Sequence, residues 1–264
     1  MAIDYSIDYP CPPKQQLGAA EILARLKSAE RAKAVIRLFR EHGDNRSPSQ
    51  MGFEFSRRTP QGDEETVVIV VQDLLDEAAE LQPLESHCVD CPANCAQRSF
   101  GCMGFIQYPI AAAAEQWLLD QLPTPEEALC WMLLRRGIAD FQYDGSSAVP
   151  LRDGSGIYFE NDVAASRQLG ELSINANQLF EMVFLVGNLN PNHGAMLLLF
   201  LRAIDRDLEA NAIMQLVPAA ADARQKHPFR LPINDANPTI AELEAFLYAL
   251  YIAWTLNVAL ILDV

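Results

Sequence analysis

Basic residues are scarce in this chain. Its 264 residues include 20 Lys and Arg against 35 Asp and Glu, which gives a formal net charge of -15 at pH 7. A surface of that sign repels phosphate backbones, so we expect no nucleic-acid partner. The composition is otherwise ordinary for a soluble chain, with 50% hydrophobic and 21% charged residues, and is sufficient for one large core or two small ones.

The sequence signatures of several enzyme classes are also missing. There is no G-x-x-x-x-G-K-[ST] phosphate loop, no G-x-S-x-G nucleophile motif, no H-E-x-x-H metal motif and no dinucleotide fingerprint. The N-terminus lacks a basic segment followed by an apolar one, so we expect no signal peptide and a cytoplasmic location. The sequence therefore names no reaction.

What the chain does contain is a cluster of four cysteines with C-x2-C-x3-C-x6-C spacing, namely Cys88, Cys91, Cys95 and Cys102. In a reducing compartment, thiols this close in sequence favour a metal over disulfides. Tetrahedral Zn(II) accepts four thiolates, and Pro92, Asn94 and Gly101 favour the chain reversals that such a site needs. Cys130, in an apolar helical run, is interpreted instead as a buried, inert thiol.

The span of the cluster resembles the structural zinc lobe of medium-chain alcohol dehydrogenases, which has C-x2-C-x2-C-x7-C spacing. The resemblance covers these fifteen residues only, and it implies a structural zinc without dehydrogenase activity. Four thiolates leave no open position, so this zinc would stabilise the fold and would not activate water. A [4Fe-4S] cluster is the alternative, because four cysteines also complete its ligand shell. Disulfides or uncoordinated thiols, and participation of Cys11 or His87, stay open.

Hydrophobic periodicity and turn residues predict an α+β, predominantly helical fold. We expect helices over residues 17–42 and 73–81, strands over 53–56 and 66–71, and a second hairpin pairing 148–152 with 157–160 around a turn at 153–156. The second strand is apolar throughout, which predicts cover on both faces. Further helices open at Thr124-Pro125 with an end at Gly137, at Asn175 with an end at Gly187, and at Asn190-Pro191.

An uncharged run over residues 245–262 predicts a final core helix. Its capping box, Thr239-Ile240-Ala241-Glu242, and a polar stripe of Tyr248, Tyr251 and Thr255 favour this interpretation over a membrane anchor. A weak change in composition divides the chain into an α+β segment, residues 1–106, which includes the metal lobe at 88–102, and a mainly helical segment, residues 107–264. The two segments can share one core.

Candidate catalytic residues are Glu181, set among apolar residues, and His193, in the first turn of a helix. Together they could form an acid/base pair, although a helix-edge carboxylate and a core or capping histidine are the plainer interpretation. The loop Asp140-Phe141-Gln142-Tyr143-Asp144-Gly145 offers carboxylates beside aromatics.

Three functional classes follow from these observations. The first, which we prefer, is a zinc-stabilised protein that binds a small molecule or another protein. The others are an iron-sulfur redox or sensor protein and a small-molecule enzyme that uses Glu181 and His193. Apolar helices such as the one containing Leu197 to Leu201 predict possible homo-oligomers.

Overall fold

The structure is a computed structural model that describes residues 2–58, 64–95, 98–153, 157–232 and 236–263. The fold is α+β and predominantly helical, as predicted, with about 51% helix and 14% strand. The chain divides into two compact units, one formed by Pro10–Cys91 and the other by Met1–Tyr9 with Pro92–Val264. This grouping differs from a division at residue 106, because the first strand pairs with strands from later in the chain.

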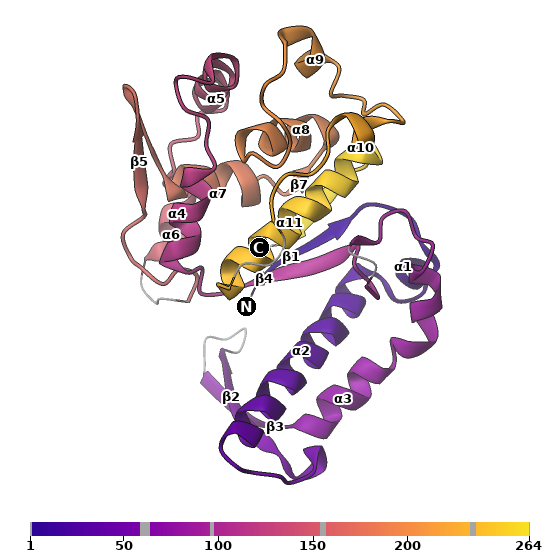
Figure 1. Cartoon of the computed structure of the whole chain (residues 1–264). Coiled ribbons are helices and arrows are strands. Elements are labelled where there is room, and N and C mark those ends of the chain that lie inside the picture. The colour runs from indigo at the N-terminus through magenta and orange to yellow at the C-terminus, as the bar shows by residue number, and fades with distance from the viewer. Residues whose placement is uncertain (1, 59–63, 96–97, 154–156, 233–235, 264) are drawn as a thin grey trace. The chain divides into compact units, whose positions relative to one another are not determined.

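The Pro10–Cys91 unit combines a helical pair with a two-stranded ribbon. Its elements are α1 (Pro12–Leu17), α2 (Ala19–Glu41), β2 (Gly52–Arg58), β3 (Glu64–Val70), α3 (Val71–Ala79) and the 3-10 helices Pro48–Gln50 and Gln82–Cys88. Helix α2 packs against α3 (Figure 1). Their shared core contains Ala32, Met51, Val71 and Leu74, with Phe39 and Phe53 at its margin.

Two expectations for this unit need correction. The helix predicted over residues 17–42 begins as the separate helix α1, because Gly18, with φ of 82°, interrupts the path before α2. Strand β3 is not covered on both faces, since Val68 on one of them is 65% exposed. The β2–β3 pairing itself is confirmed, and the predicted turn between the strands lies at residues 59–63, outside the described residues.

The other unit is built on a four-stranded antiparallel sheet in the order β4-β1-β8-β7. Its strands are β1 (Ala2–Ile7), β4 (Met103–Gln107), β7 (Asn188–Leu189) and β8 (Leu260–Asp263), with a separate hairpin of β5 (Ser166–Leu169) and β6 (Leu172–Asn175). Its helices are α4 (Ala112–Asp120), α5 (Ala128–Phe141), α6 (Val149–Arg152), α7 (Ala176–Phe184), α8 (Pro191–Phe200), α9 (Ala210–Met214), α10 (Ala223–Lys226) and α11 (Pro238–Thr255), with a 3-10 turn at Ser146–Ala148.

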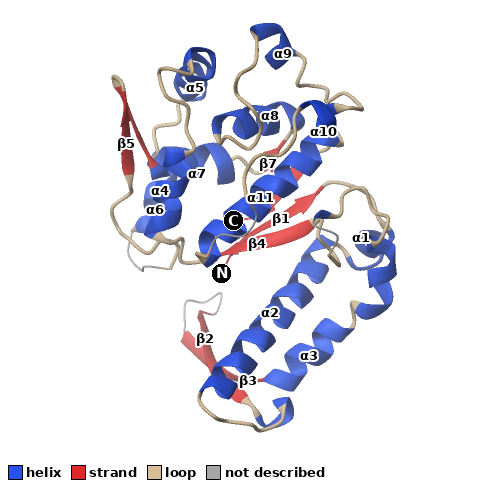
Figure 2. Ribbon diagram, in the orientation of Figure 1, coloured by secondary structure: helices blue, strands red, loops and turns tan. Residues whose placement is uncertain are grey.

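Helix α11 is the centre of this unit's core. It contacts β4 and β1 of the sheet as well as helices α8 and α4 (Figure 2). Partners on several sides explain its almost uniformly apolar sequence, because a helix that is hydrophobic all round is a buried helix. Phe246, Leu247 and Trp254 are essentially inaccessible to solvent. Among the helices that the structure describes, none has the length and apolar character needed to cross a membrane.

Helix α11 begins and ends differently from the final helix that the sequence predicted. Asn237 is the N-cap residue of α11, and its side chain accepts the backbone N–H groups of Thr239 and Ile240. The carboxylate of Glu242, predicted to complete a capping box, instead accepts the backbone N–H of Gln107 at 2.7 Å. The helix stops at Thr255 because Asn257 has a left-handed backbone, and residues 260–263 then form β8.

Two other sequence predictions for this unit are wrong. Residues 149–152 form helix α6 and do not pair as a strand with 157–160; part of the expected turn lies at 154–156, outside the described residues. Helix α5 begins at Ala128 and continues through Gly137 to Phe141. Leu197 to Leu201, from which self-association was expected, are at most 5% exposed, and self-association of the chain stays a prediction.

Candidate functional site

A cavity of about 510 Å³ lies between helices α5 and α8. Both helices belong to the same unit and contact one another directly. The cavity wall is mostly apolar and includes Leu134, Ile138, Met182, Met196 and Leu197. A largely apolar cavity with a few polar groups is the usual form of a small-molecule site.

The start of α8 places a histidine on this wall. Asn190 is the N-cap residue, as the sequence predicted, and its side-chain oxygen accepts the backbone N–H of His193 at 3.0 Å. Pro191 follows at the first helical position, where its missing N–H costs nothing. These two local features fix the first turn of α8, and with it the position of His193.

His193 is a neutral hydrogen-bonding group in this site. Burial lowers the pKa of its imidazole below the ordinary value, and a hydrogen bond to the backbone carbonyl of Met182 opposes that effect only in part. In the neutral ring, one nitrogen carries a proton and can donate it, and the other presents a lone pair. His193 therefore brings a hydrogen-bond acceptor to the cavity wall.

Helix α5 supplies the opposite wall. Gly137 lies in the lining, and a Cβ atom added to it would meet no other atom within 4 Å. Arg136 and Asp140 form an exposed ion pair at 2.7 Å and also border the cavity. Gln142 ends α5 in the left-handed conformation, and the chain then returns so that Tyr143 joins the lining.

Tyr143 is a lining residue that carries a hydroxyl group. Burial, with a smaller contribution from the charge of Glu181, raises the pKa of this phenol. The hydroxyl is therefore protonated at neutral pH and can both donate and accept a hydrogen bond. Tyr143 lies in the loop Asp140-Phe141-Gln142-Tyr143-Asp144-Gly145, which combines carboxylates with aromatics.

Glu181 does not line this cavity, although it lies one residue before Met182. Its side chain is buried in α7 and turned toward the loop after α5. One carboxylate oxygen accepts the backbone N–H of Gly145 at 2.7 Å, and the other accepts that of Ser147 at 2.6 Å. Within the described ranges, no ion pair joins Glu181 to His193. The structure thus places the two predicted residues in one neighbourhood but does not couple them as an acid/base pair.

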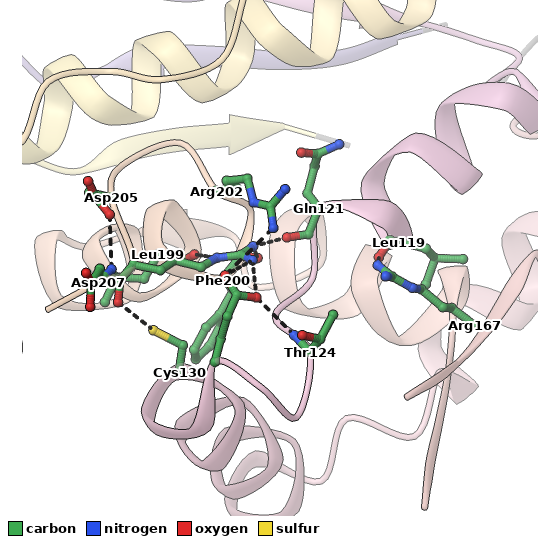
Figure 3. Close-up of polar contacts among 12 residues, drawn as sticks. Leu119, Gln121, Thr124, Cys130, Arg167, Leu199, Phe200, Arg202, Asp205 and Asp207 are labelled. Carbon is green, nitrogen blue, oxygen red and sulfur yellow. Dashed lines mark hydrogen bonds and ion pairs between the residues drawn. The ribbon is translucent and has the colours of Figure 1, made fainter. Parts of the chain in front are cut away.

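A second cavity, of about 570 Å³, lies at the start of α5 beside the buried guanidinium of Arg206. This group bonds to the carboxylate of Glu127 at 2.9 Å and donates to the carbonyls of Leu199, Gln121 and Phe200 (Figure 3). Burial lowers the pKa of Arg206, while the charge of Glu127 opposes the shift. Because the guanidinium is already bonded to groups from three segments, its role here is to join them.

Cys130 belongs to the same junction, as Figure 3 shows. Its thiol is buried and donates to the carbonyl of Arg206 at 3.7 Å. Burial raises the pKa of Cys130, which keeps the side chain in the less reactive thiol form. These observations agree with its interpretation as an inert core residue.

The cysteine cluster is divided by the unit boundary. Cys88 and Cys91 end the Pro10–Cys91 unit, while Cys95 and Cys102 belong to the other. All six cysteines of the chain are thiols in the structure. Among the described residues, which omit Ala96 and Gln97 of this loop, no three His, Cys, Asp or Glu side chains are arranged to hold a metal ion. The four-cysteine metal site therefore stays a prediction from the spacing.

Each half of the cluster has the local reversal that was expected. The Cys91 N–H donates to the Cys88 carbonyl at 3.4 Å, which closes the C-x2-C turn. In the other half, Asn94 accepts the backbone N–H of Gly101 at 3.1 Å. A Cβ atom at Gly101 would lie only 2.2 Å from the Cys95 carbonyl oxygen, so this close approach requires glycine. The loop thereby brings the backbone beside Cys102 against Cys95.

The two other residues considered for the metal site differ in position. His87 is exposed on the 3-10 helix that ends at Cys88. Cys11 is half-buried and is the N-cap residue of α1, which packs against that same 3-10 helix. Cys11 thus lies in the unit that contains Cys88 and Cys91.

Comparisons of the chain with protein-family models, curated proteins and solved structures found no match. The assignment of function consequently rests on the site itself. Sequence reasoning missed Gly137 as a wall of the cavity, because it was expected to end a helix. It also missed Arg206, whose partners come from segments up to 85 residues away.

Proposed function

We propose that the protein binds a small, largely apolar molecule in the cavity between α5 and α8. The observation that supports this proposal most directly is a 510 Å³ space whose mainly apolar wall carries the neutral imidazole of His193. Apolar surface supplies affinity in such a site, and a few polar groups fix the orientation of the ligand. This role is the small-molecule form of the ligand-binding function expected from the sequence.

An enzyme that uses Glu181 and His193 is the weaker proposal. A carboxylate that serves as a catalytic acid or base must reach the proton it transfers. Both carboxylate oxygens of Glu181 accept backbone N–H groups, those of Gly145 and Ser147. Of the two candidate residues, only His193 borders the cavity. The geometry thus favours recognition of a ligand over proton transfer between these two residues.

Binding can be tested by replacing Gly137, which lines the cavity, with a side chain large enough to fill it. N-phenyl-1-naphthylamine, an uncharged fluorophore that brightens in apolar surroundings, is titrated into the native protein. We expect saturable fluorescence that Gly137→Phe abolishes and Gly137→Ala retains, because only the larger side chain projects far into the space. Circular dichroism and a thermal melt establish that both variants are folded. Equal binding by the folded Phe and Ala variants would refute the site.

We also propose that Cys88, Cys91, Cys95 and Cys102 bind one structural Zn(II). The support is their spacing, together with the closed C-x2-C turn and the tight loop between Cys95 and Cys102. Metal analysis after anaerobic purification should yield a colourless protein with one zinc per chain. A brown protein with iron and sulfide would instead establish the iron-sulfur alternative.

A cysteine substitution separates a structural zinc from an adventitious one. Cys91→Ser should release the metal and lower the melting temperature, because metal binding contributes to folding free energy. Cys130→Ser is the matched control, since this thiol is bonded at the Arg206 junction and should leave zinc content unchanged. Full zinc content in folded Cys91→Ser would contradict the proposed ligand set.

A further inference from the structure

We infer that the ligand of the α5–α8 cavity is an uncharged molecule with an apolar body and one hydroxyl or N–H group, which donates a hydrogen bond to His193. This inference rests on the proposed function and specifies the ligand's chemistry. It follows from three features of the cavity: the imidazole acceptor, the pairing of the nearby charges and the apolar remainder of the wall.

The acceptor follows from the place and the protonation state of the imidazole. His193 lines the cavity, and burial lowers its pKa, so the ring is neutral and has one nitrogen that can only accept a hydrogen bond. A ligand that covers this nitrogen with a hydrocarbon surface would leave a buried acceptor unsatisfied, which is costly in an apolar site. A ligand with a suitably placed O–H or N–H satisfies it and keeps the affinity contributed by the apolar wall.

The charges around the cavity disfavour an anion. Arg136 is the cation on the wall, and it is paired with Asp140 at 2.7 Å. His193 is neutral, and the whole chain carries a formal charge of -15. A carboxylate ligand would thus give up its hydration without gaining an unpaired positive partner. An ammonium ligand likewise meets no unpaired carboxylate among the described residues of the lining, because Asp140 is paired with Arg136.

Tyr143 also favours an alcohol over a hydrocarbon. Its protonated hydroxyl can donate to the oxygen of a ligand alcohol. An alcohol or phenol can therefore use two of the polar groups of the wall, donating to His193 and accepting from Tyr143. A pure hydrocarbon uses neither.

Three probes with one shared ring system test this inference: 1-naphthol, naphthalene and 1-naphthoate, each competing with N-phenyl-1-naphthylamine at pH 7.5. We expect naphthol to bind about tenfold more tightly than naphthalene, the effect of one net hydrogen bond, and naphthoate to bind most weakly. His193→Phe should remove the preference for naphthol while retaining naphthalene, and His193→Gln, which keeps a side-chain acceptor, should restore part of it.

The possible results distinguish failure of the inferred ligand class from failure of the proposed binding function. Equal affinities for naphthol and naphthalene, or tighter binding of naphthoate, would overturn the ligand class while leaving an apolar binding site in place. A naphthol preference that survives in folded His193→Phe would overturn the role of His193. If none of the three probes competes and the fluorophore itself does not bind, both the inference and the proposed function fail.

Discussion

Replacing Glu115 with glutamine tests how strongly a buried ion pair holds the helices of the sheet-containing unit together. Glu115 on α4 pairs with Arg152 on α6, and both side chains are at most 4% exposed. Arg152 also donates to Asn177 and to the carbonyl of Asn161, and its guanidinium lies 3.8 Å from the ring centre of Phe159. This one cation therefore connects α4, α6, α7 and the segment before β5.

The expected cost follows from the burial of the pair. Desolvation lowers the pKa of Arg152 to about 10, which still leaves it protonated at pH 7. Glu115→Gln keeps the shape of the side chain but removes its charge, and the guanidinium then remains buried without a counter-ion. Breaking a buried pair in this way typically costs about 3–5 kcal/mol of unfolding free energy. Urea unfolding should show a lower midpoint with an unchanged slope.

An exposed ion pair in the same unit supplies the control. Arg136 and Asp140 on α5 are 2.7 Å apart, and their side chains are 76% and 48% exposed. Asp140→Asn should cost less than about 0.5 kcal/mol, as is usual for exposed i,i+4 pairs. If Glu115→Gln is no more destabilising than Asp140→Asn, the buried pair does not hold these helices and our reasoning from desolvation is wrong.

Three further predictions concern the cavity and its helices. Gly137→Ala should stabilise the protein by about 0.5–1 kcal/mol in urea unfolding, because alanine is the better helix former and its Cβ meets nothing. Gly194→Ala should gain less or destabilise, since its Cβ would lie 3.1 Å from buried Leu250, so equal effects at the two glycines would contradict this packing argument. Asn190→Ala should cost about 1 kcal/mol through loss of the α8 cap, and an unchanged melting curve would show that this cap contributes nothing. The folded-state pKa of His193 is lowered, so on acidification the unfolded chain binds this proton before the folded chain does. The free energy of unfolding therefore falls as the pH drops from 7 to 5, by at most about 1.4 kcal/mol per pH unit for one proton. His193→Gln should lose less stability over this range in urea unfolding at each pH, and parallel curves would refute the sign of the shift.

Signals confined to a few neighbouring residues predicted local structure well. The start of α7 is one example, because Asn175 and Gln178 form a complete capping box with each other. The start of α8 is another, since Asn190 needs only the N–H of His193, three residues later. In both cases the partners lie within one helical turn, so no tertiary contact is required to form the cap.

Prediction from neighbouring residues was wrong for carboxylates whose partners lie far away in the sequence. Glu127 does accept the N–H of Thr124, as a capping box requires, but it also pairs with Arg206, and α5 starts only after it. Glu242 bonds to Gln107, which is 135 residues away, and the cap of α11 moves to Asn237. A single sequence does not show which distant group will compete for a side chain.

The sheet was missed for a related reason. Ile3, Tyr5 and Ile7 alternate with polar residues and are buried, which is the pattern of a strand with one covered face. The run is short, and its partners Gly104 and Leu262 lie at the middle and end of the chain. Pairing over such separations is specified by the assembled core and not by the strand itself.

Glu181 is another carboxylate whose partners lie far away in the sequence, and these partners follow Tyr143 of the proposed binding site. Its two oxygens hold the N–H groups of Gly145 and Ser147, in the loop that follows Tyr143. Gly145 has φ of 86°, and an added Cβ would approach Asn177 at 3.0 Å, so the loop depends on glycine at this point. Gln178 fixes the same segment by donating to the Tyr143 carbonyl. Glu181 thus holds the loop that follows Tyr143, and in the proposed binding site its role is to position that loop.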